Sequence, residues 1–116
     1  MNVKLALIVS MALLFAVLGP PARSQEVDQR HIQIAQIEID PAQLDSYKAA
    51  VQEQIDAAIR LEPDVLVLYS VSGKDNPARV TVFEIYRNRD AYLAHLQAPH
   101  FLKYKASVEK MVKSLK

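Results

Sequence analysis

The sequence predicts one small α+β domain with an antiparallel sheet, in the chain order strand, helix, strand, strand, helix. Three observations lead to this fold class. Residues 31–39 alternate as a strand does, residues 41–61 carry an apolar stripe at helical spacing, and residues 65–86 contain two strand-like runs separated by a turn. This order of elements is the ferredoxin-like pattern, here a β-α-β-β-α chain without the usual last strand.

The first strand is expected over residues 31–39, because alternate side chains there would point to opposite faces of a sheet. One face carries His31, Gln33, Ala35, Ile37 and Ile39, and the other carries Ile32, Ile34, Gln36 and Glu38. Neither face is purely polar. A sheet that is covered on both sides would explain this mixture.

The first helix is expected just after residues 40–41, because aspartate is a good N-cap and proline fits the first helical position. Gln43 would complete a variant of the capping box. The helix should end near Leu61, since proline at position 63 disfavours helix in the residue before it. Its predicted buried stripe comprises Leu44, Tyr47, Val51, Ile55 and Ala58.

A β-hairpin is predicted next. Residues 65–71 are rich in β-branched and aromatic side chains, and residues 73–77 (Gly-Lys-Asp-Asn-Pro) form the strongest turn signal in the chain. Gly73 is the only glycine after residue 24, so we expect it to have a positive φ or to mark a bulge. The strand over residues 79–86 then pairs back on the first strand of the hairpin.

The last part of the chain is predicted to be helical from about Arg89, with an interruption at Pro99. After the interruption an apolar stripe at helical spacing comprises Phe101, Tyr104, Val108, Met111, Val112 and Leu115. Because this helical pattern runs to the last residues, we expect no fourth strand.

The N-terminal residues resemble an export signal. Lys4 gives a positive start, residues 5–18 are apolar apart from one serine, and residues 22–24 (Ala-Arg-Ser) fit a cleavage site before Gln25. The apolar run is short for a membrane span, which needs about 20 residues. We therefore expect residues 1–24 to be a signal peptide, residues 25–116 to be the mature domain, and the protein to be periplasmic or secreted. The alternative is an uncleaved N-terminal anchor.

Composition excludes several classes of function. Cleavage after residue 24 would leave 12 basic and 13 acidic side chains, a balance that argues against nucleic acid as a partner. With no cysteine in the chain, a disulfide, a thiol nucleophile and an iron–sulfur site are all impossible. The lysines after residue 100 are read as a solvated face in preference to an anion-binding patch. A domain this small has a marginal core, so we expect a homodimer.

Familiar catalytic motifs are missing from the sequence. One glycine after residue 24 cannot build a phosphate-binding loop, and no serine lies in a nucleophile elbow. His95 and His100 are five residues apart, a rotation of about 500° on a helix, so the two side chains should not share a face. We therefore expect no metal site; the alternative is that the proline between the two histidines reorients His100. The remaining set of tyrosines, histidines and one glutamate could bind an aromatic molecule and exchange a proton with it.

These candidate residues fall on two predicted faces that could line one pocket. Strand alternation groups Glu84 and Tyr86, and helical spacing groups Tyr92 and His95. Each residue also has a structural alternative: the tyrosines in the core, His95 at the surface or as a cap, and His100 bonded to the backbone. Glu84 in an apolar strand needs a partner, either in this group or among the nearby arginines Arg87 and Arg89. His31 is expected to be exposed.

Three short motifs in this region resemble the antibiotic biosynthesis monooxygenase family. They are residues 83–86 (Phe-Glu-Ile-Tyr), residues 94–96 (Ala-His-Leu) and residues 99–101 (Pro-His-Phe). The resemblance implies a dimeric α/β barrel that oxidises a quinol, phenol or polyketide-like aromatic with dioxygen and without metal, flavin or haem. It implies catalytic roles for His100 and His95, and substrate-binding roles for Tyr86, Tyr92, Glu84 and Phe101.

Two departures from the family pattern limit the functions that the resemblance implies for this chain. Val82 stands where some members have an asparagine, and no histidine lies near Tyr104 and Lys105, where haem-degrading members would need one. Haem degradation is therefore disfavoured. The rival hypothesis, from another class of function, is an exported domain of the same fold that binds a small molecule without turnover or serves in a stress response.

Overall fold

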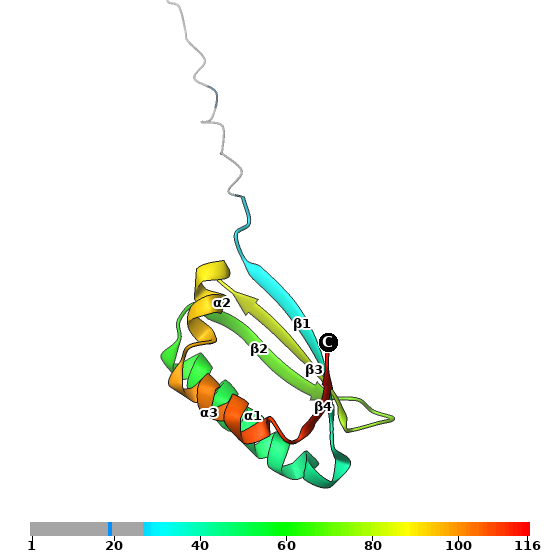
Figure 1. Ribbon diagram of the computed structural model, residues 1–116. Coiled ribbons are helices and arrows are strands. Elements are labelled where there is room, and N and C mark those ends of the chain that lie inside the picture. The colour runs from blue at the N-terminus through cyan, green and yellow to red at the C-terminus, as the bar shows by residue number, and fades with distance from the viewer. Residues whose placement is uncertain (1–18, 20–26) are drawn as a thin grey trace, which may run out of the picture.

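The computed structural model describes residue 19 and residues 27–116, which form four strands and three α-helices (Figure 1). In chain order the elements are β1 (His31–Ile39), a 3-10 turn (Pro41–Gln43), α1 (Leu44–Leu61), β2 (Val65–Ser72), β3 (Arg79–Tyr86), α2 (Arg89–His95), α3 (Pro99–Val108) and β4 (Val112–Leu115). The predicted signal peptide lies outside the described residues except for Gly19. Among the helices of the described part, none is both long and apolar enough to cross a membrane.

The four strands form one antiparallel sheet in the order β2-β3-β1-β4. This order and the α+β succession are those of the ferredoxin-like fold, as the sequence predicted. Residue pairing places His31 opposite Tyr86 and Gln33 opposite Glu84 across β1 and β3. These four residues share one face of the sheet, since side chains of the same parity point to the same side.

All three helices lie on this inner face of the sheet (Figure 1). The predicted stripe of α1 is confirmed: Tyr47 and Ala58 are in the core cluster, and Leu44, Val51 and Ile55 pack against it. The predicted cap before α1 is confirmed in part, because the Asp40 side chain accepts a hydrogen bond from the Ala42 N–H and Pro41 opens the 3-10 turn. The capping box with Gln43 does not form, since the Asp40 N–H donates to Met111 O. The helices and the sheet therefore enclose a single core.

The prediction that the last strand is missing is wrong. α3 ends at Val108, and β4 pairs antiparallel with the free edge of β1. Lys116 N–H donates to Gln36 O and Gln36 N–H donates to Lys116 O, both at 2.9 Å. Without β4, the outer edge of β1 would expose a row of unpaired backbone groups. Pairing with a distant strand therefore overrides the local helical spacing of the last apolar residues.

Gly73 also differs from its prediction, because its φ is not positive. A Cβ atom added at this position would lie 2.8 Å from the backbone oxygen of Asn76 and 3.4 Å from that of Arg79. The Gly73 N–H donates to Arg79 O at 2.8 Å, which closes the turn between β2 and β3. Close backbone packing, and not an unusual φ, explains the glycine.

Within residues 27–116 no helix covers the outer face of the sheet, although both faces were expected to be covered. It exposes apolar side chains of β1 and β2, namely Ile32, Ile34, Tyr69 and Val71. Phe83 of β3 lies between the two strands, opposite Ile34 on one side and Tyr69 on the other. The described chain therefore leaves a contiguous apolar sheet face open to solvent.

Candidate functional site

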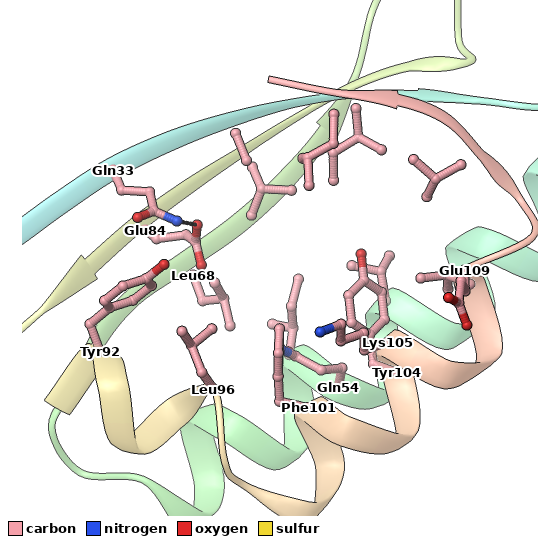
Figure 2. Close-up of a pocket in the computed structure, with 18 residues that line it drawn as sticks. Gln33, Gln54, Leu68, Glu84, Tyr92, Leu96, Phe101, Tyr104, Lys105 and Glu109 are labelled. Atoms are coloured by element: carbon pink, nitrogen blue, oxygen red, sulfur yellow. Dashed lines mark hydrogen bonds between the residues drawn. The ribbon is translucent and has the colours of Figure 1, made fainter.

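A cavity of about 410 Å³ lies between the inner face of the sheet and the helices (Figure 2). Its walls are mainly apolar and come from all four strands and all three α-helices of the described chain. β4 contributes Val112 and Leu115, so the strand that the sequence did not predict forms part of the wall. A volume of this size suits a small organic molecule.

One end of the cavity is polar and is organised around Glu84 (Figure 2). The Glu84 carboxylate accepts a hydrogen bond from Gln33 Nε2 at 2.9 Å and another from the Tyr86 hydroxyl at 2.7 Å. The Oε1 atom of Gln33 in turn lies 3.1 Å from His31 Nε2. A carboxylate has about four lone-pair directions, so these two bonds leave acceptor capacity for a ligand.

Aromatic rings flank this polar end. Tyr92 stacks on His31 with ring centroids 4.3 Å apart and meets Tyr86 edge to face at 5.3 Å. Figure 2 shows the Tyr92 hydroxyl directed towards Glu84, and Phe101 further along the cavity. Tyr104 lines the opposite side. The arrangement can hold a flat ring between aromatic walls and offer its hydroxyl group a carboxylate acceptor.

Burial keeps the neighbouring phenols protonated. It raises the pKa of Tyr86 far above its ordinary value, and the hydrogen bond to Glu84 adds to this effect. Burial also raises the pKa of Tyr104, although its hydrogen bond to Tyr47 acts in the opposite direction. Tyr86 therefore serves as a hydrogen-bond donor to Glu84 at every ordinary pH and does not act as a base.

The structure separates the predicted site residues into two groups. Glu84, Tyr92 and Phe101 line the cavity, whereas Tyr86, His95 and His100 are not among its lining residues. Tyr86 is fully buried and contacts the lining residues Glu84, through a hydrogen bond, and Tyr92, through its ring. The alternative partners proposed for Glu84, Arg87 and Arg89, do not bond it; Arg87 instead pairs with Asp64.

The two histidines meet at Glu62, the residue before Pro63, where the sequence predicted only the end of the first helix. His95 Nδ1 lies 2.8 Å from Glu62 Oε2, and His100 Nε2 lies 2.6 Å from the same oxygen. The expectation that His95 and His100 point apart is wrong, because they do not belong to one helix. Ala98, which precedes Pro99, is extended and separates α2 from α3.

Gln54 connects this cluster to the cavity. Its Nε2 atom is 3.0 Å from His95 Nε2, and Gln54 is also a lining residue of the cavity. Two signals in the sequence pointed to the residues that were missed. Gln54 is a polar side chain three residues after Val51 on a buried helical stripe, and Glu62 is an acid at a helix C-terminus, where the helix dipole disfavours it.

The fold and the site together define a class: a ferredoxin-like domain with a largely apolar, small-molecule-sized cavity that ends in a hydrogen-bonded carboxylate. The sequence profile of the family described as antibiotic biosynthesis monooxygenase matches residues 30–107. The chain therefore belongs to the antibiotic biosynthesis monooxygenase family. Among curated proteins, none matched the chain significantly.

Solved structures agree with this assignment. A protein from Bacteroides thetaiotaomicron, provisionally named an antibiotic biosynthesis monooxygenase, is 43% identical over 76% of this chain and 84% of its own, with a TM-score of 0.75. A provisionally named monooxygenase from Lactobacillus acidophilus is 27% identical over 78% of this chain and 43% of its own, with a TM-score of 0.76. A Nitrosomonas europaea protein, at 21% identity over 78% of this chain and 86% of its own and a TM-score of 0.73, supports the fold.

Proposed function

We propose that this protein is a cofactor-independent monooxygenase that oxidises a quinol or a related phenol with dioxygen. The observation that carries the proposal is the placement of Glu84. It is a half-buried carboxylate at one end of a cavity whose walls are mainly apolar and aromatic, whereas the other charged lining residues, Lys105 and Glu109, are exposed. Family membership supports monooxygenase chemistry, and the cavity supports an aromatic substrate.

The reaction balances without an added reductant. A hydroquinone reacts with one molecule of dioxygen to give a hydroxyquinone and one molecule of water. One oxygen atom forms a bond to a ring carbon and the other leaves in water, while the ring supplies all four electrons. The protein must bind the ring, take a proton from its hydroxyl group and keep bulk water from the activated ring.

Glu84 is the group that we assign to proton removal. A substrate hydroxyl placed against its free lone pairs would donate a hydrogen bond to it and then its proton. Gln33 and Tyr86 hold the carboxylate in one orientation, so it need not reorganise when the proton moves. Tyr92 and Phe101 would bind the ring. His95 and His100, for which the family resemblance implied catalysis, would act only indirectly, through Gln54.

Oxygen consumption tests this proposal directly. The purified mature protein, treated with a chelator, would be incubated with a panel of hydroquinones and phenols while dissolved oxygen is recorded. Protein-dependent uptake with one oxygen atom from ¹⁸O₂ in the product is the expected result. If the same compounds raise the melting temperature but no oxygen is consumed, the protein is a binding domain, which is the rival function.

A homodimer is part of the proposal. Ile34 and Tyr69 are 60% and 67% exposed on the outer sheet face, and a monomer would leave this apolar surface in water. A second copy of the chain, packed sheet against sheet, would cover it. The family's tendency to form dimers supports this assembly.

Export of the protein to the periplasm or the medium is also part of the proposed function. Cleavage would occur before Gln25, and this part of the proposal depends on the sequence of residues 1–24.

A further inference from the structure

The cluster of Glu62, His95 and His100 lies outside the cavity wall and is not used by the proposed reaction. The three side chains come from different elements: Glu62 follows α1, His95 ends α2 and His100 is in the first turn of α3. One ligand atom from each lies within 4.8 Å of the other two. The break between α2 and α3 is what brings the two imidazole rings to the same carboxylate oxygen.

The charge of Glu62 is poorly compensated where it lies. Its side chain is 18% exposed, and those of His95 and His100 are 1% and 13% exposed. Among the described residues, the ion-pair partners of Glu62 are these two histidines, with no lysine or arginine in contact. A bound cation would stabilise a carboxylate in such a place directly.

We propose that Glu62, His95 and His100 form a binding site for a divalent transition metal ion such as Zn²⁺ or Co²⁺. Two imidazole nitrogens and one carboxylate oxygen are ligands that these ions prefer, whereas Ca²⁺ and Mg²⁺ prefer oxygen alone. Three protein ligands leave a further coordination position for water or a small ligand. The site is separate from the cavity and its occupancy does not depend on the proposed activity.

The geometry requires only a small adjustment. Ligand atoms bound tetrahedrally at about 2.0–2.1 Å from Zn²⁺ lie about 3.3 Å from one another. The two nitrogens are now 2.8 and 2.6 Å from Glu62 Oε2, so each must withdraw by roughly half an ångström to admit the ion. Rotation of the Glu62 and His100 side chains, which are not fully buried, can provide this space.

A second observation favours a metal ligand role for His95. A histidine that binds metal through Nδ1 carries its proton on Nε2 and needs an acceptor for it. Gln54 faces His95 Nε2, and the Gln54 Oε1 atom is buried without a hydrogen-bond partner. Rotating this amide by half a turn would present Oε1 to the His95 Nε2–H. Gln54 can therefore provide the acceptor that a metal-bound His95 requires.

The ion has a route to the site. His100 lines a small hollow of about 50 Å³ between α1 and α3, on the other side of Gln54 and Tyr104 from the main cavity. His100 and Glu62 both keep some solvent exposure, whereas His95 is sealed. We expect His100 and Glu62 to capture the ion and His95 to complete its coordination.

Titration of the chelator-treated mature protein with Co²⁺ tests the site. Co²⁺ is the probe because its visible absorption bands report coordination number and nitrogen ligation. One ion per chain, displaced by Zn²⁺, is the expected result. His100→Asn and Glu62→Gln should each weaken binding by at least about tenfold, because each removes a ligand. His31→Asn, which removes a histidine outside the cluster, should bind Co²⁺ as the wild type does.

Folding is monitored in the same experiment. The melting temperature of each variant would be measured with a chelator and with Zn²⁺, and only the wild type and His31→Asn should be stabilised by Zn²⁺. Absence of saturable binding to the wild-type protein would overturn the proposal. So would unchanged binding in folded His100→Asn and Glu62→Gln, since the ion would then lie elsewhere. These measurements read metal binding and not turnover, so the proposal can fail while the oxygenase activity stands.

Discussion

The Tyr86 hydroxyl donates a 2.7 Å hydrogen bond to Glu84 Oε1, and this bond joins a fully buried side chain to one that lines the cavity. The two residues are second neighbours on one face of β3, so the strand itself sets their spacing. Gln33, directly opposite Glu84 on β1, holds the other carboxylate oxygen. The sheet therefore fixes the orientation of the proposed base before any substrate binds.

Glu84→Gln should remove the base without disturbing its frame. Glutamine has the same size, and the Tyr86 hydroxyl can turn to accept a hydrogen bond from the new amide. We expect the turnover number for a hydroquinone to fall by about 10²–10⁴-fold, with little change in melting temperature. Steady-state oxygen uptake and thermal unfolding measure the two quantities. Turnover equal to that of the wild type would show that Glu84 is not the base.

Tyr86→Phe is the matched comparison for this variant. It keeps the carboxylate in the cavity and removes only one of the two bonds that orient it. The turnover number should fall less than in Glu84→Gln, while the free energy of unfolding should fall by about 1–2 kcal/mol because a buried hydrogen bond is lost. A loss of turnover as large as that of Glu84→Gln would instead assign a direct role to the Tyr86 hydroxyl.

Buried tyrosines should make the protein sensitive to alkali. Burial raises the pKa of Tyr47, Tyr86 and Tyr104, so the folded state keeps protons that the unfolded chain releases near pH 10. The contribution of these tyrosines to the free energy of unfolding is therefore complete below a pH of about 10. It is lost as the pH rises further, by up to about 1.4 kcal/mol per pH unit for each tyrosine. Denaturant unfolding between about pH 8 and pH 11 measures this slope.

Tyr47→Phe should lose less stability at alkaline pH than the wild type. The fall in the free energy of unfolding per pH unit should be smaller by about the contribution of one tyrosine. The comparison uses the difference between two pH values within each protein, so a general loss of stability from the broken Tyr47–Tyr104 bond does not affect it. An equal slope in wild type and Tyr47→Phe would contradict the raised pKa of Tyr47.

Gly73→Ala should destabilise the hairpin although Gly73 has an ordinary φ. The new Cβ would meet the backbone oxygen of Asn76 at 2.8 Å, and a backbone atom cannot move aside as a side-chain tip can. We expect a loss of about 1–2 kcal/mol in the free energy of unfolding. Lys74→Ala, at the exposed neighbouring position, should change it little. No loss in Gly73→Ala would mean that the turn relaxes around the added methyl group.

Local signals in the sequence were sufficient for most of the fold. The Asp40 cap, the stripe of α1 and the turn at Gly73 each depend on residues a few positions apart, and the structure has the elements that they predicted. β4 could not be predicted in this way, because Val112 and Leu115 have helical spacing and become a strand only through pairing with β1. That pairing joins residues more than 70 positions apart, which no local pattern reports.

The residues of the candidate site also differ in whether local sequence patterns could identify them. Glu84 and Tyr92 lie within one continuous stretch, where strand and helix periods placed each on a face that could line a pocket, and Phe101 followed from the family resemblance. Gln54 in α1 and Glu62 just after it reach His95 only through tertiary packing. The meeting of His95 with His100 depends on the extended backbone at Ala98, whose conformation determines how α3 leaves α2. A rotation angle computed for one unbroken helix therefore gave the wrong relation between the two histidines.

The proposed dimer makes the last prediction. Ile34 is 60% exposed at the centre of the outer sheet face, opposite Phe83, so a charge there would be buried between two copies of the sheet. Ile34→Glu should give a protein of half the wild-type mass in light scattering at micromolar concentration. The fold should survive, because residue 34 does not face the core. Ala49→Glu, an equal charge at an exposed position of α1, should leave the dimer intact. A wild-type protein that scatters as a monomer, or an Ile34→Glu variant that stays dimeric, would rule out this face as the interface.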